Sequence, residues 1–287
     1  MAGATGHPLR AVGIFVHPRL PAASPLAREI ARWLEERGVR VWETDSLDEG
    51  TVLPDLESTD LLVTLGGDGS ILRAAHHTAG HPPLILGVNL GRMGFLTEAE
   101  PDGWREVLER VWQGAYWVEE RMMLRATVGT GDLPVRDALN DVVVGPGALG
   151  RVVHLEARVD GDLLTTYVAD ALIVATPTGS TAYALAAGGP IMPPQQRNIL
   201  LVPVAPHLSL DRAVVLAEGV RVRVVVRGHS PASLIVDGEV VAELGPGEAV
   251  EVEASPRVAR FARVRERDYF YRTLMARLVP RRVTIQR

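Results

Sequence analysis

The chain of 287 residues carries 30 basic and 35 acidic side chains, and 47% of its residues are hydrophobic. This composition predicts a globular protein of one large or two ordinary domains, and the net charge of −5 argues against nucleic acid or an anionic membrane as the main partner. Because the sequence has no cysteine and no lysine, it excludes disulfides, thiolate catalysis, Schiff-base chemistry and a Walker-type phosphate loop. Met1 to His7 lacks a signal pattern and no apolar run has membrane-spanning length, so we expect a cytoplasmic protein.

Residues 1–118 alternate between short apolar runs and helical segments. Ser24-Pro25 is typical of a helix start, Gly38 of a helix end, and Pro82-Pro83 forbids continuation of a helix. The alternation predicts a doubly wound α/β domain with its ligand at the carboxyl ends of the strands. The predicted strands are 10–16, 39–44, 61–65 and 84–88, and the predicted helices are 25–37, the segment after a glycine turn to about 79, and 101–114.

Residues 119–287 predict a mostly-β, sandwich-like domain. Asp160-Gly161 and Asp237-Gly238 are signals for tight hairpin turns, and the charged run Glu119-Glu120-Arg121 is typical of a solvated face. Residues 268–278 return to a helical pattern, which we expect to pack back on the first domain. The predicted strands are 153–159, 171–175, 220–227, 234–236, 240–242, 250–254 and 258–264.

The most informative stretch of the first domain is the turn Gly66-Gly67-Asp68-Gly69-Ser70, directly after the apolar run 61–65. A strand, a glycine turn and a helix place backbone N–H groups where an anionic ligand can meet them. A carboxylate in such a phosphate cradle repels the ligand unless it binds a metal or accepts a hydrogen bond from a hydroxyl. A simple tight turn is the alternative. A second glycine-rich segment, 87–96, follows one βα unit later and contains Asn89.

Two segments of the second domain also carry candidate ligand groups. Asn140-Asp141 can contact ribose hydroxyls or an amide, although an Asx turn is the favoured explanation of the pair taken alone. Thr176 to Tyr183 combines several hydroxyls with one aromatic ring after an apolar strand, which suits a sugar and a flat base better than a helix cap does. Ser180 lacks the Gly-x-Ser-x-Gly setting of a hydrolase. His76, His77 and His81 do not have convergent spacing, so we expect no metal site there.

Together these segments resemble the NAD kinase family across nearly the whole chain. The glycine turn alone is shared with diacylglycerol-kinase-like and phosphofructokinase-like enzymes. The specific pattern combines that turn with Asn89-Leu90-Gly91, Gly94-Phe95-Leu96, Asn140-Asp141, Thr176 to Tyr183, and Val204-Ala205-Pro206-His207. The resemblance implies an α/β domain and a β-rich domain, with NAD bound between them.

The resemblance also implies roles for individual residues. Asp68 is expected to be the general base that takes the proton of the adenosine ribose 2′-hydroxyl, and Gly66, Gly67 and Asn89 are expected to form the phosphate-donor loop. Ala205 matches a position that a neighbouring subunit contributes, so we expect a homodimer or homotetramer. The implied NAD contacts are Asp68, Gly69, Arg73, Asn140, Asp141, Arg151, Asp170, Thr178, Thr181, Ala182, Tyr183, Ala186 and Ala205.

Three positions depart from the family pattern: Asp141 stands where glutamate is usual, Ala171 where glycine often stands, and Glu239 where glutamine often stands. The implied reaction is phosphoryl transfer from ATP or polyphosphate to NAD. Because the protein has no lysine, Mg²⁺ or another divalent metal carried by ATP is expected to neutralise the donor phosphates, with no permanently bound cofactor. Two alternatives stay open on the residues alone. One is a lipid or sugar kinase that shares the turn, and the other is an NAD(P)-binding sensor without turnover.

Overall fold

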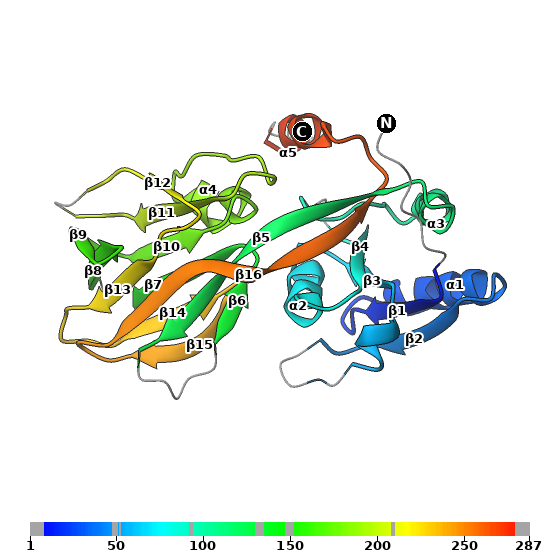
Figure 1. The fold of residues 1–287 in the computed structure, drawn as a ribbon, viewed down its shortest axis with the longest axis horizontal. Coiled ribbons are helices and arrows are strands. Elements are labelled where there is room, and N and C mark those ends of the chain that lie inside the picture. Colours follow the sequence, from blue (N-terminus) through cyan, green and yellow to red (C-terminus); the bar gives the residue numbers. More distant parts are fainter. Residues whose placement is uncertain are drawn as a thin grey trace, which may run out of the picture. The chain divides into compact units, whose positions relative to one another are not determined.

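The computed structural model describes residues 9–47, 51, 53–91, 94–129, 135–146, 152–207 and 210–278. For residues 276–278 it describes the backbone only. The chain divides into two compact units, Met1–Glu119 with Arg260–Arg287, and Glu120–Ala259 (Figure 1). Two long strands, β5 and β16, run from one unit into the other along the chain. None of the helices described is long and apolar enough to cross a membrane.

The first unit is built on a parallel sheet with strand order β2-β1-β3-β4, and the last residues of β16 lie next to β4, where Phe261 pairs with Ile85. All six residues of β1 and of β3 are buried, as expected for strands covered on both faces. The α/β fold predicted for this part of the chain is therefore confirmed. Its strands are β1 (Ala11–Val16), β2 (Arg40–Thr44), β3 (Leu61–Gly66) and β4 (Leu84–Asn89), and its helices are α1 (Ala23–Glu35), η1 (Leu56–Ser58), α2 (Asp68–Thr78), α3 (Trp104–Trp112) and α5 (Tyr269–Leu278).

Helix α1 begins earlier than predicted. Ala22 is its N-cap and no side chain caps it, so the prediction that Ser24 caps the helix is wrong. The preceding turn, in which the Ala23 N–H donates to the Leu20 carbonyl, already directs the chain into the helix. The predicted end is confirmed, because Gly38 has a φ of +77°.

The second unit packs two antiparallel sheets face to face, which confirms the predicted β-sandwich. One sheet has the order β12-β11-β10-β7-β14-β15, and the other contains β16-β13-β8-β9 with β5 and β6. Alternate residues of β7 and β10, such as Val142 and Leu172, enter the core between the sheets. Their neighbours Val143 and Ile173 face the opposite side, where Ala184 and Met192 cover them.

The strands predicted in this unit are present, with one difference in their bounds, but the structure also has strands that were not predicted: Trp117–Val128, Arg136–Ala138, Asp162–Ala169, Asn198–Val204 and Val214–Ala217. The hairpin turns are confirmed, because Asp160 and Asp237 have φ values of 51° and 48° and a left-handed glycine follows each. The two strands predicted at 250–254 and 258–264 are one continuous strand, Ala249–Arg263, which runs through Pro256. The elements are β5 (Trp117–Val128), β6 (Arg136–Ala138), β7 (Asp141–Pro146), β8 (Val153–Val159), β9 (Asp162–Ala169), β10 (Ala171–Ala175), η2 (Gly179–Thr181), α4 (Tyr183–Ala186), β11 (Asn198–Val204), β12 (Val214–Ala217), β13 (Val222–Val226), β14 (Ala232–Val236), β15 (Glu239–Leu244) and β16 (Ala249–Arg263).

Candidate functional site

The glycine turn lies at the carboxyl edge of the parallel sheet. Strand order β2-β1-β3-β4 reverses direction between β1 and β3, and ligands of doubly wound sheets bind outside the carboxyl ends at such a point. β3 ends at Gly66, Gly67 is the N-cap of α2 without a side-chain cap, and Asp68 is the first helical residue. A Cβ on Gly67 or Gly69 would meet nothing within 4 Å, so open space borders this backbone. The arrangement suits an anionic ligand at the start of α2.

The Asp68 carboxylate is fixed from two sides by the backbone of the second glycine-rich segment. Its Oδ2 accepts the Phe95 N–H at 2.6 Å, and its Oδ1 accepts the Leu96 N–H at 3.0 Å. A carboxylate has about four lone-pair positions, so each oxygen keeps one for another partner. Gly94 is required here, because a Cβ at this position would lie 2.0 Å from Asp68 Oδ1. The result is an oriented, half-buried acceptor beside open backbone.

The other residues predicted in this unit have different settings. Asn89 is only 3% exposed, and its amide donates to Glu100 Oε2 at 3.2 Å and accepts the Gly91 N–H at 3.2 Å. This side chain therefore stabilises its own turn. Arg73 is half-buried on α2, five residues after Asp68.

Sequence reasoning missed the loop that follows β1. His17 donates its backbone N–H to the Leu65 carbonyl, and a Cβ on Gly66 would lie 3.6 Å from the His17 Cβ. His17 Nδ1 accepts the Arg19 N–H at 3.2 Å, which places the proton of the neutral ring on Nε2. His17 thus lies beside the glycine turn, and the exposed Arg19 follows two residues later. Their position directly after the first predicted strand was the sequence signal that could have placed these residues near the site.

In the second unit, Asn140 and Asp141 lie where β7 begins, next to the end of β10. The Thr176 N–H donates to the Asn140 carbonyl, and Asp237 accepts the N–H groups of Leu139, Asn140 and Asp141 at 2.7–3.0 Å. Asp141 is 5% exposed, and its burial, with the nearby Asp237 charge, raises its pKa to about 7. Asp237, expected only as a turn residue, therefore fixes the Asn140-Asp141 segment.

The segment after β10 is held closely against Asn140. A Cβ on Gly179 would lie 2.0 Å from the Asn140 carbonyl oxygen, so only glycine fits. The buried Ser180 hydroxyl donates to the Pro177 carbonyl and accepts the Met192 N–H, which gives it a structural role. Of the positions predicted to contact ligand here, Tyr183 is 45% exposed, Ala186 is exposed and Thr181 and Ala182 are half-buried, whereas Thr178 is buried.

Asp170 and Ala205 lie at the opposite end of β10 from Asp141. Asp170 is exposed and donates its N–H to the Val204 carbonyl, and Ala205 is exposed with a φ of 44°. Five residue steps along β10 separate Asp170 from Ala175, the residue paired with Asp141, a distance of about 16 Å at a rise of about 3.3 Å per residue. The predicted residues of this unit thus form two groups at opposite ends of one sheet. Arg151 lies outside the described residues.

The chain is similar to known proteins over most of its length. Residues 54–116 match the family model of the ATP-NAD kinase N-terminal domain, and residues 139–264 match that of the ATP-NAD kinase C-terminal domain. An NAD kinase from Chloroflexus aurantiacus is 40% identical over 272 residues, which cover 94% of this chain and 99% of that protein. The chain belongs to the NAD kinase family. An NAD kinase from Heliobacterium modesticaldum is 41% identical over 90% of this chain and 95% of its own.

Solved structures of NAD kinases share the fold. Yeast NADH kinase complexed with NADH superposes with a TM-score of 0.84 and 27% identity over 97% of this chain and 91% of its own. An NAD kinase from Archaeoglobus fulgidus in complex with ATP superposes with a TM-score of 0.76 and 27% identity, over 93% of this chain and 98% of its own. The resemblance stated from the sequence motifs is therefore confirmed as a family relationship.

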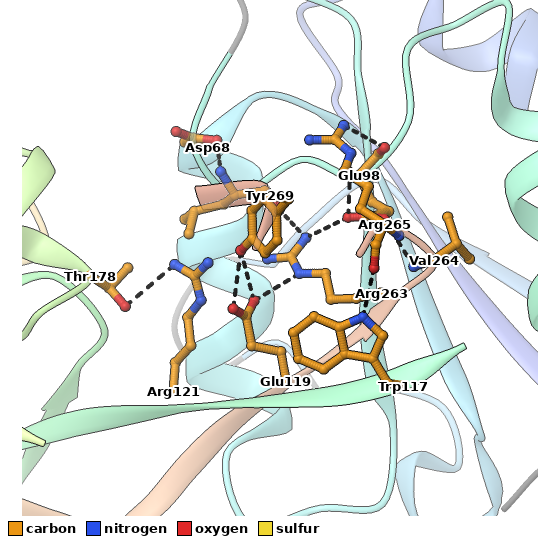
Figure 2. Close-up of polar contacts among 11 residues, drawn as sticks. Asp68, Glu98, Trp117, Glu119, Arg121, Thr178, Arg263, Val264, Arg265 and Tyr269 are labelled. Atoms are coloured by element: carbon orange, nitrogen blue, oxygen red, sulfur yellow. Dashed lines mark hydrogen bonds and ion pairs between the residues drawn. The ribbon is translucent and has the colours of Figure 1, made fainter. Parts of the chain in front are cut away.

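The interpretation of residues 119–121 as a solvated face is wrong. Glu119 and Arg121 are 2% and 3% exposed, and only Glu120 of the three is exposed. Glu119 accepts a hydrogen bond from Arg263 at 2.8 Å, and Arg121 lies 3.5 Å from the Thr178 hydroxyl (Figure 2). Their partners lie 57 or more residues further along the chain, which local sequence patterns do not show.

The described residues contain no group of three or more histidine, aspartate or glutamate side chains that could hold a metal ion. His77 Nε2 lies 3.1 Å from the Leu47 carbonyl, and His81 Nδ1 lies 2.6 Å from Glu57. Asp68 offers one carboxylate with free lone pairs beside the glycine turn. One carboxylate suits a Mg²⁺ ion that is held mainly by nucleotide phosphates and water.

Proposed function

We propose that this protein is an NAD kinase that transfers the terminal phosphoryl group of ATP to the 2′-hydroxyl of the adenosine ribose of NAD, giving NADP. The observation that carries the proposal is the geometry of Asp68. Its carboxylate is oriented by two backbone N–H groups and lies at the N-terminus of α2, next to open glycine backbone. A site for phosphoryl transfer to a hydroxyl needs both an acceptor for the proton and donors for the phosphate.

Asp68 accepts the proton of the 2′-hydroxyl as the oxygen attacks phosphorus. The N–H groups at the start of α2 and the nearby Arg19 stabilise the phosphate charge, because the chain has no lysine for this task. When bound with ATP, Mg²⁺ neutralises the β- and γ-phosphates. Positioning by a carboxylate base typically contributes about 10²–10⁴-fold to the rate.

We infer that Asn140, Asp141, Thr178, Thr181, Ala182 and Tyr183 contact the adenosine part of NAD. Asp170 and Ala205, about 16 Å away at the other end of β10, are too distant for the same ribose. Asp170 is proposed to contact the nicotinamide side of NAD, and Ala205 to complete the site of a neighbouring subunit, which makes the active protein a homodimer or homotetramer. Analytical ultracentrifugation tests this: a catalytically competent monomer over the assay concentration range would contradict it.

The test of the function is the conversion of NAD to NADP by the purified protein with ATP and Mg²⁺. We expect turnover, and we expect Asp68→Asn to lower kcat about 10²–10⁴-fold while the Kd for NAD stays within tenfold. Binding of NAD without product would support the sensor instead. Product from a lipid or sugar but none from NAD would support the other kinase class.

Asp60→Asn is a matched control for the aspartate substitution. Asp60 Oδ2 also accepts two backbone N–H groups, those of Arg10 and Ala11, but at the amino end of the same sheet. We expect this variant to keep kcat within about twofold. If Asp68→Asn turns over like the wild type, Asp68 is not the base.

A further inference from the structure

The first unit contains a buried ion-pair cluster that the proposed reaction does not use directly. Arg263 is 1% exposed and contacts two carboxylates that are also buried, Glu98 and Glu119. Its Nε donates to Glu119 Oε2 at 2.8 Å, and its Nη1 donates to Glu98 Oε2 at 3.1 Å (Figure 2). Burying three charged groups is costly, so the cluster needs an explanation beyond stability.

The cluster is connected to Asp68 by one residue. Arg263 Nη1 also donates to the Leu96 carbonyl at 2.8 Å, and the Leu96 N–H donates to Asp68 Oδ1 at 3.0 Å. Both backbone groups flank the same Cα, so fixing the carbonyl restricts the direction of the N–H. Because Asp68 is a short side chain at the start of a helix, the direction of this N–H restricts the plane of its carboxylate.

The two carboxylates that contact Arg263 are themselves fixed by surrounding groups. Glu98 Oε1 accepts the N–H groups of Val264 and Arg265, both at 2.9 Å, and the Tyr269 hydroxyl lies 3.0 Å from Glu119 Oε1. Burial lowers the pKa of the Arg263 guanidinium, but Tyr269 and the two carboxylates raise it more, so the pKa lies above its ordinary value. The cation is therefore permanent.

On the basis of the proposed function, we propose that Arg263 is a positioning residue for phosphoryl transfer, orienting the Asp68 carboxylate through Leu96. The guanidinium is suited to this role because its planar fork reaches Glu119, Glu98 and the Leu96 carbonyl at once. Tyr269 extends the same network to α5, near the end of the described chain. Sites that hold a base to within about 0.5 Å generally depend on such supporting hydrogen bonds.

Arg263→Lys is the first test, because it keeps the charge but removes the fork. We expect kcat to fall about 10–100-fold while the KM values for NAD and ATP stay within about twofold. Tyr269→Phe removes one hydroxyl from Glu119 and is expected to lower kcat about two- to fivefold. Trp117→Phe is the matched control, because the indole N–H bonds the Arg265 carbonyl in the same cluster but has no bond toward Leu96. Its kcat should remain within about twofold.

Combining each substitution with Asp68→Asn separates positioning from general structural damage. If Arg263 acts through Asp68, Arg263→Lys has little further effect in the Asp68→Asn background, since residues that act as a unit are not additive. Hydrogen exchange of the Phe95 and Leu96 amides gives a readout independent of turnover. We expect faster exchange at these amides in Arg263→Lys, and unchanged exchange at Val63 in β3.

Three outcomes would overturn the inference. These are an unchanged kcat in a cooperatively folded Arg263→Lys protein, a rise in KM alone, or an equal loss of activity in the Asp68→Asn background. If Arg263→Lys does not fold, Tyr269→Phe is judged by the same criteria. A wild-type protein that makes no NADP would reject the function itself, whereas active wild type with an insensitive Arg263 rejects only the positioning role.

Discussion

Gly94→Ala tests the orientation of Asp68 without changing any charge. The ideal Cβ of an alanine at position 94 would lie 2.0 Å from Asp68 Oδ1 and 2.3 Å from its Cγ, at least 0.7 Å closer than the 3.0 Å below which Cβ contacts are essentially never seen. Either the carboxylate or the segment that donates to it must move by about 1 Å.

A displacement of about 1 Å at a reacting group can lower a rate about 10²-fold. That loss corresponds to about 2.7 kcal/mol in the activation free energy. We therefore expect kcat for NADP formation to fall about 100-fold at saturating NAD and ATP. The KM for NAD should change less, because the proposed adenosine contacts lie in the second unit.

Gly103→Ala is the control for Gly94→Ala. Gly103 lies in the same unit at the start of α3, and its ideal Cβ meets only the Glu100 carbonyl oxygen at 3.7 Å, an ordinary contact. Thermal melting of both variants establishes that they fold. A folded Gly94→Ala protein with wild-type kcat would refute the claim that the 94–96 segment fixes the catalytic carboxylate.

Two further predictions concern the Asn140-Asp141 segment. The raised pKa of Asp141 disfavours its charged form, so its contribution to the stability of the native state is complete below about pH 4 and is lost as the pH rises to about 7. Asp141→Asn should therefore be more stable than wild type at pH 8 by up to about 4 kcal/mol. Denaturant unfolding at a series of pH values should show this advantage shrinking toward pH 4. An advantage independent of pH would contradict this cause. Asp237→Asn keeps a residue that tolerates the φ of 48°, but it turns one acceptor atom of the side chain into a donor. We therefore expect the free energy of unfolding to fall by about 1–3 kcal/mol and the KM for NAD to rise. Unchanged values in both measurements would show that the three backbone contacts are unimportant.

Most of the architecture could be predicted from the sequence because buried strands, turns and helix ends depend on residues that lie close together in the chain. The buried strand β10 coincides with the predicted apolar run 171–175, and both Asp-Gly pairs form the hairpin turns that their left-handed conformations allow. The start of α1 was wrong by about two residues, since a turn at Leu20 rather than a side-chain cap begins the helix. Errors of this kind affect boundaries and leave the fold unchanged.

Residues whose roles depend on distant partners could not be predicted in this way. Glu119 belongs to a charged run that is typical of a surface, yet Arg263, 144 residues further along the chain, makes it a buried acceptor. Asp237 has the sequence context of a turn, but its carboxylate binds backbone groups 96–98 residues earlier. The neighbouring residues in the sequence can be the same whether a charged side chain is solvated or is buried against a remote segment. Only the tertiary structure distinguishes a solvated carboxylate from one that fixes a loop.

Four carboxylates of this chain share one structural device, in which an acidic side chain accepts two or more backbone N–H groups from a remote segment. Asp60, Glu98 and Asp237 use it to hold residues 10–11, 264–265 and 139–141, respectively. Asp68 differs from them because it also begins a helix beside open glycine backbone. Its two N–H contacts fix the carboxylate and leave lone pairs for a substrate hydroxyl. The same device that stabilises loops elsewhere in the chain therefore orients the proposed base here, and the proposed support by Arg263 follows because Leu96 belongs to both networks.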